Sequence, residues 1–147
     1  MASPQKVVLD DRLLIEELLV GLPRARRRIE LHTTSSWYYR ACRAAASGAG
    51  GHLSGPFEQL QAAEQERAVL SLLELRDEIG LPDPRATIPL MVETAARRPR
   101  LNLLNLEATA FAHLLRGTVW LSEESAAGIL PSVLADEGVA WATVAIV

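Results

Sequence analysis

The chain has 147 residues, of which 49% are hydrophobic, and its 15 Lys and Arg against 18 Asp and Glu give a formal net charge of −3. This composition predicts one globular domain over residues 1–147 and excludes a disordered chain. No apolar run reaches the ~18 residues of a membrane-spanning helix, the first residues lack a signal peptide, and one cysteine excludes an internal disulfide and a cysteine metal cluster. We therefore expect a cytoplasmic protein that makes no membrane contact.

In the first half of the chain, short apolar runs alternate with helical periodicity. Residues 6–9, Lys-Val-Val-Leu, contain a short continuous apolar run, which is typical of a buried strand. Asp10 and Asp11 follow, and the next residues have a helical period that ends at Gly21. The remaining predicted elements of this half are a strand over residues 29–33, a helix over 37–46, a glycine-rich loop over 47–56 and a long helix over 57–79.

The second half continues the alternation of helices and strands. Its predicted elements are helices over residues 86–97, 101–115 and 122–137 and strands over 118–121 and 139–147. The helix at 101–115 is apolar on more than one face and is expected inside the domain. Because proline disrupts helix interiors, the sequence does not decide whether the helix at 122–137 continues through Pro131. Strands separated by helices predict an α/β fold with a small, mostly parallel sheet of about four or five strands flanked by helices.

Acidic residues follow the predicted strands or enter them. Asp10 ends the first strand, Glu123 and Glu124 follow the third, and Glu107 lies in the apolar helix before it. Functional groups gather at the carboxyl ends of parallel strands, and several carboxylates there would suit Mg²⁺ or Mn²⁺. The alternative is structural. Asp11 and Glu124 would then complement helix dipoles, and Glu107 would pair with an arginine.

The ends of the sequence resemble the PIN-domain family, the nuclease domains of VapC-type toxins. The resemblance rests on Val7-Val8-Leu9-Asp10 before an apolar helix, the acid in the alanine-rich residues 104–112, the strand, hydroxyl and acids of 118–124, and Gly138-Val139 before the last strand. It implies a PIN-like fold, Mg²⁺- or Mn²⁺-dependent cleavage of RNA and a small antitoxin protein as a partner.

The resemblance also implies which residues form the site. Asp10 matches the first of the family's four acids, and Glu107 matches the third, where Asp is usual. Glu124, or second in preference Glu123, matches the fourth acid, and Ser122 takes the position of a hydroxyl residue. The resemblance therefore assigns Asp10, Glu107 and Glu124 as catalytic residues, and these three with Glu123 as metal ligands.

The sequence departs from the family at the second acid. That acid belongs on the helix after strand two, but residues 37–43 read Trp-Tyr-Tyr-Arg-Ala-Cys-Arg. Because the ion supplies the nucleophile in such chemistry, a missing ligand implies a weak or absent nuclease. Two functions follow as alternatives. One is a divergent or inactive RNA-directed PIN-like protein, and the other is a non-catalytic module that binds another protein through the cleft where the family's acids lie.

Other side chains suggest partners. We predict that Arg40, Arg43 and Ser122 contact RNA, whereas the arginines of residues 24–28 and 97–100 are more simply explained as solubilising charges. The aromatic run of residues 37–39 would stack on unpaired bases, fill the core or form a dimer surface. With the apolar tail at 141–147, this run predicts a homodimer.

Overall fold

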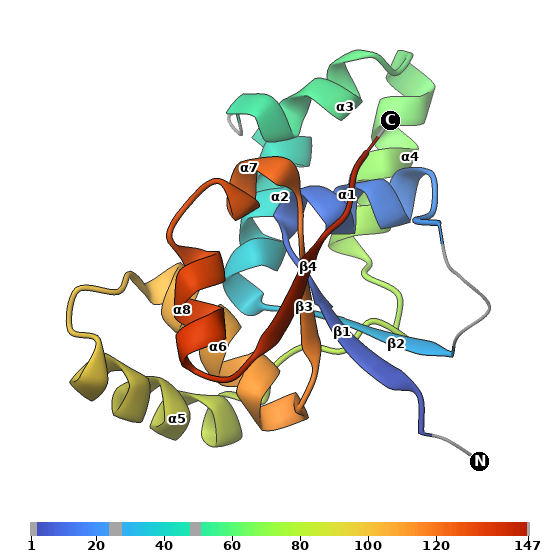
Figure 1. Ribbon diagram of the computed structural model, residues 1–147. Coiled ribbons are helices and arrows are strands. Elements are labelled where there is room, and N and C mark those ends of the chain that lie inside the picture. Colours follow the sequence, from blue (N-terminus) through green and yellow to red (C-terminus); the bar gives the residue numbers. More distant parts are fainter. Residues whose placement is uncertain (1–2, 24–27, 48–50, 147) are drawn as a thin grey trace.

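Four parallel strands form the centre of the molecule (Figure 1). They are β1 (Gln5–Leu9), β2 (Ile29–Thr33), β3 (Thr118–Leu121) and β4 (Ala140–Thr143), in the spatial order β2-β1-β3-β4. The computed structural model describes residues 3–23, 28–47 and 51–146, so residues 24–27 of the basic cluster lie outside the described residues. The sheet confirms the predicted α/β class and its mostly parallel arrangement.

Helices occupy most of the chain between the strands. They are α1 (Asp11–Leu19), α2 (Ser35–Ser47), the 3₁₀ helix η1 (Gly51–Ser54), α3 (Gly55–Glu58), α4 (Ala62–Leu73), α5 (Pro84–Arg97), α6 (Leu103–Leu115), α7 (Glu123–Ala126) and α8 (Leu130–Asp136). Within the described ranges, no helix combines the length and the apolar character that crossing a membrane requires.

The side chains of β1 divide between two hydrophobic cores, one on each face of the sheet. Val7 and Leu9 belong to the core that includes α1 and α4, whereas Val8 belongs to the core that includes α6 and α8. Figure 1 shows α1 and α4 on one side of the sheet and α6 and α8 on the other. Because both faces of β1 are covered, its sequence is a continuous apolar run rather than an alternation.

The predicted long helix over residues 57–79 is wrong in its length. Two helices, α3 and α4, cover parts of it, and the chain leaves the helical conformation after Leu73. At its end, Gly80 pairs in parallel with His32 of β2, where its N–H donates to Leu31 O at 2.9 Å. A Cβ at Gly80 would lie 2.2 Å from His32 Nδ1, so only glycine fits this close approach. In the described part of the chain, this isolated bridge, and not a fifth strand, lies beside β2.

Two further boundaries differ from the predictions. The helix over residues 122–137 is divided into α7 and α8, and Pro131 lies in the first turn of α8, where its missing N–H costs nothing. The last strand, expected over 139–147, ends at Thr143, although Val144 still donates its N–H to Leu121 O at 2.9 Å.

Candidate functional site

Asp10 directly follows β1, and its side chain is completely buried. Oδ1 accepts a hydrogen bond from the Leu13 N–H at 2.8 Å and so caps α1. Oδ2 accepts two hydrogen bonds from Ser122, from the backbone N–H at 2.8 Å and from the hydroxyl at 2.6 Å. Because β1 and β3 are parallel neighbours, the residues after them reach the same edge of the sheet. Asp10 thereby ties the start of α1 to the end of β3.

Burial dominates the electrostatics of Asp10. The pKa of its carboxyl is raised from 3.8, first because burial removes water from the charged form and second because Asp11 places another negative charge beside it. The hydrogen bonds from Ser122 and Leu13 lower the pKa, but they do not outweigh burial. The carboxyl of Asp10 therefore takes up a proton more readily than a solvated aspartate.

Asp11 forms an ion pair with Arg40 of α2. Its Oδ2 accepts a hydrogen bond from Arg40 Nε at 2.7 Å, and its Oδ1 accepts one from the Arg12 N–H at 2.8 Å. The Asp11 side chain is 6% exposed and that of Arg40 is 49% exposed. The pair therefore holds α1 against α2 with the carboxylate inside and part of the guanidinium in solvent.

Glu107 lies in the middle of α6 but caps a different helix. Its Oε1 accepts a hydrogen bond from the Ser36 N–H at 2.8 Å, and its Oε2 accepts one from the Ser35 N–H at 3.3 Å. The next N–H of α2, that of Trp37, donates to the hydroxyl of Thr34 at 3.0 Å. Together these acceptors satisfy the first free N–H groups of α2, and the carboxylate also complements its dipole.

A cavity of about 310 Å³ opens where α1, α2, α6 and α7 meet. Its polar lining consists of Asp11, Arg40, Glu124, Ser125, Asn102 and Asn105. Glu124 and Glu123 are both exposed in the first turn of α7, and of these two only Glu124 lines the cavity. The carboxylates of Asp10 and Glu107 are not part of this lining, because each faces the backbone groups that it caps.

These side chains, as arranged, do not fit Mg²⁺ or Mn²⁺, which need carboxylate oxygens that are free to act as ligands, for Mg²⁺ at about 2.0–2.1 Å. Among the described residues, no three His, Cys, Asp or Glu side chains are grouped so that they could hold one metal ion. The oxygens of Asp10 and Glu107 accept hydrogen bonds from the chain, and Asp11 is paired with a guanidinium. The metal-ligand and catalytic roles of Asp10, Glu107, Glu123 and Glu124 stay predictions.

The predicted RNA contacts occupy different environments. Ser122 is 1% exposed, and its hydroxyl donates a hydrogen bond to Asp10. Arg40 and Arg43 lie on the exposed surface of α2, and Tyr39 beside them is 64% exposed. By contrast, Trp37 of the same aromatic run is 2% exposed and packs in the core with α6 and α8. Of these two aromatic side chains, Tyr39 is the one available for a base.

The sequence interpretation assigned Asp11 only a possible structural role at the start of α1. In the structure Asp11, rather than Asp10, lines the cavity together with Glu124. The sequence signal for Asp11 was the pair of acids after a buried strand. Asp10 caps α1, and the side chain of Asp11 is then free to pair with a residue of α2. Its partner Arg40 is 29 residues away, so no local pattern connected them.

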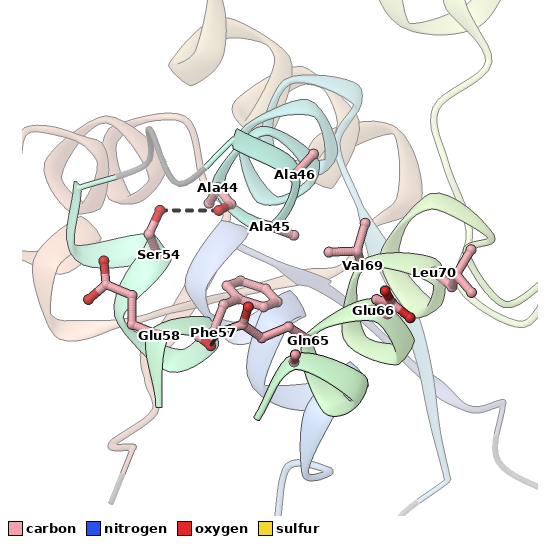
Figure 2. Close-up of a pocket in the computed structure, with 11 residues that line it drawn as sticks. Ala44, Ala45, Ala46, Ser54, Phe57, Glu58, Gln65, Glu66, Val69 and Leu70 are labelled. Carbon is pink, nitrogen blue, oxygen red and sulfur yellow. Dashed lines mark hydrogen bonds between the residues drawn. The ribbon is translucent and has the colours of Figure 1, made fainter. Parts of the chain in front are cut away.

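A second hollow, of about 720 Å³, lies between α2, α3 and α4, away from this cavity (Figure 2). Ala44, Ala45, Phe57, Val69 and Leu70 give it an apolar lining, and Ser54 donates a hydrogen bond to Ala44 O at 3.1 Å across one side. Glu58, Gln65 and Glu66 add polar groups. We call this hollow the α2–α4 groove.

Comparison with known proteins identifies the fold. No protein-family profile matches this chain, and no curated protein sequence matches it. The 2.2 Å structure of VapBC-1 from nontypeable Haemophilus influenzae is similar over 94% of this chain and 97% of that chain, with a TM-score of 0.51 and 14% sequence identity. At this identity the likeness concerns the fold alone, and the chain has the PIN-like fold that its motifs predict.

Proposed function

We propose that this chain is an RNA-binding protein of PIN-like fold that has lost divalent-ion-dependent cleavage. The observation that carries the proposal is the surface of α2, where Tyr39, Arg40 and Arg43 are exposed and Arg40 also lines the polar cavity. An exposed aromatic ring stacks on an unpaired base, and guanidinium groups bind phosphates. The arrangement suits a short stretch of single-stranded RNA.

The loss of cleavage follows from the same cavity. Hydrolysis of a phosphodiester by this kind of site needs an ion that activates water and stabilises the developing charge. Here a guanidinium stands beside Asp11, and Asp10 and Glu107 each hold backbone N–H groups. We therefore expect slow or undetectable cleavage with Mg²⁺ and somewhat more with Mn²⁺, if any residual site forms.

The test combines binding and cleavage of one fluorescent single-stranded RNA. In chelator, fluorescence anisotropy should show binding that weakens as salt is raised, because phosphate contacts release counterions. Tyr39→Ala and Arg43→Gln should each weaken binding, by about tenfold for the lost stacking contact. Arg85→Gln is the matched control, since Arg85 is an exposed arginine on α5, which does not line the cavity.

The same RNA is then incubated with Mg²⁺, with Mn²⁺ and with chelator. We expect no difference in cleavage between Mg²⁺ and chelator. Robust Mg²⁺-dependent cleavage that disappears in Asp10→Asn would contradict the loss of activity and would restore the nuclease with Asp10 as a ligand. Equal affinity of wild type, Tyr39→Ala and Arg43→Gln for RNA would contradict the proposed surface.

Binding of a small partner protein is the second candidate function. The family resemblance implies a small antitoxin protein as a partner, and the α2–α4 groove offers an apolar surface where Leu70 is 52% exposed (Figure 2). An antitoxin-like protein would bury these side chains. A folded chain that binds no RNA in the assay above would favour this alternative.

A further inference from the structure

We infer that the guanidinium of Arg40 takes the place of a divalent cation in the cavity at the carboxyl edge of the sheet. The inference rests on the proposed function insofar as that function assumes a site without a metal ion. The geometry points to it because Arg40 Nε lies 2.7 Å from Oδ2 of Asp11, whose side chain is only 6% exposed. The wild-type chain then holds no Mg²⁺ or Mn²⁺ at this position.

The buried carboxylate of Asp11 needs a cation. An ionised carboxylate that leaves water without a partner is strongly disfavoured, so a buried acid is paired or coordinates a metal. The neighbouring Arg12 does not fill this role with its side chain, because its guanidinium bonds Glu16 at 3.1 Å and only its backbone N–H reaches Asp11. Arg40 is therefore the group that neutralises Asp11.

The guanidinium of Arg40 differs from a bound metal ion because it is covalently part of the protein and cannot dissociate. Arginine is charged at every accessible pH and is tethered to α2, so neither dilution nor a chelator removes it. A divalent ion that entered beside Asp11 would meet this positive charge at close range and would be repelled. The site is thus closed to ions by a side chain of the protein itself.

The net charge of the cavity also disfavours a divalent cation in the wild-type chain. Its charged lining is two carboxylates, Asp11 and Glu124, and one guanidinium, which leaves a net charge of −1. Replacing Arg40 by Glu would change this net charge to −3 and would add ligand oxygens on the helix that lacks the second acid. Ion affinity rises with the number of charged ligands, so this one substitution should open a cation site.

The experiment measures Mn²⁺ binding to the protein without RNA, by the loss of the electron paramagnetic resonance signal of free Mn²⁺. We expect Arg40→Glu to bind one Mn²⁺ at least about tenfold more tightly than wild type, and Arg40→Gln to lie between them. Arg43→Glu is the matched control, because it makes the same change of charge at an exposed position on the same helix. Adding Asp11→Asn to Arg40→Glu should abolish the gain.

Thermal unfolding in chelator checks that each variant is folded, and Arg40→Gln, which removes the guanidinium without adding a negative charge beside Asp11, carries the test if Arg40→Glu does not fold. Two results would overturn the inference: wild type that binds one Mn²⁺ as tightly as the Arg40 variants, or an equal gain in Arg43→Glu. Because no RNA is present, this result is independent of whether the chain binds RNA. The proposed function and the inference can therefore fail separately.

Discussion

The buried carboxyl of Asp10 should leave a signature in the pH dependence of stability. Its folded-state pKa is raised above the usual 3.8, so the folded protein binds this proton more tightly than the unfolded chain. The contribution of this group to stability is therefore fully present below pH 3.8 and is lost as the pH rises through the folded-state pKa. Urea unfolding of wild type and Asp10→Asn, compared in chelator over this range, should show the advantage of wild type shrinking as the pH increases.

A difference that grows with pH would contradict this expectation and would mean that a positive charge lies beside Asp10. The asparagine variant also loses acceptor capacity toward Ser122, whose hydroxyl and N–H both donate to Oδ2. This loss is the same at every pH. It therefore lowers the unfolding free energy of Asp10→Asn by a constant amount and does not change how the difference from wild type varies with pH.

At the residue scale, positions after strands were predictable and side-chain partners were not. The placement of Asp10 at the carboxyl edge follows from one apolar run and an acid. The structural alternative for Glu107 was an ion pair with an arginine, but its partner is the backbone of α2, because a helix start that lies against α6 presents free N–H groups. Such partners depend on how helices pack, which no local pattern in the sequence records.

At the scale of elements, the capping of α2 by Glu107 should be measurable. Glu107→Ala leaves the N–H groups of Ser35 and Ser36 without their acceptors, and we expect a loss of about 1–2 kcal/mol in unfolding free energy. Glu107→Gln retains one acceptor and should lose less. Chemical denaturation in the presence of chelator measures both. An unchanged or increased stability of Glu107→Ala would show that the carboxylate is held at a cost, as in a metal site.

Strands β2 and β3 were predicted more accurately than the helix over 57–79. β3 was predicted at the residues that form it, and β2 likewise, because buried parallel strands are short apolar runs with sharp ends. The helix over 57–79 was overestimated, since its apolar spacing continues past Leu73, where α4 ends, up to the segment in which Gly80 pairs with His32. That pairing joins segments far apart in the sequence, and such a contact overrides local helical periodicity.

At the scale of the whole molecule, the edge strand β4 bears on the predicted homodimer. All four of its residues are exposed, Trp141 is 38% exposed, and residues 139–147 contain no charged side chain. Among the described strands it pairs only with β3, so its outer edge is a template for another strand. Burial of Trp37 removes one part of the original argument, and the prediction now depends on this edge.

We expect light scattering at tens of micromolar to give twice the 16.0 kDa mass of one chain. Trp141→Lys, which places a charge on the exposed edge, should shift the mass toward that of a monomer. Leu103→Lys is the control, because Leu103 is 66% exposed at the start of α6 and does not belong to the sheet. A monomer mass for wild type would reject the homodimer.

The bond between Asp10 and Ser122 also constrains when the site can exist during synthesis. It joins residues 112 positions apart, and β1 pairs with β3, which is synthesised after β1 and β2 and after all of helices α1 to α6. A nascent chain emerges from its N-terminus, so Asp10 and Asp11 leave the ribosome long before α7 and Glu124. A ribosome-bound fragment that ends before residue 118 can pair β1 with β2, but it lacks β3 and the α7 residues that line one side of the cavity. The cavity of a newly made chain therefore stays unformed until β3, α7 and the residues up to Leu130 have also left the ribosome.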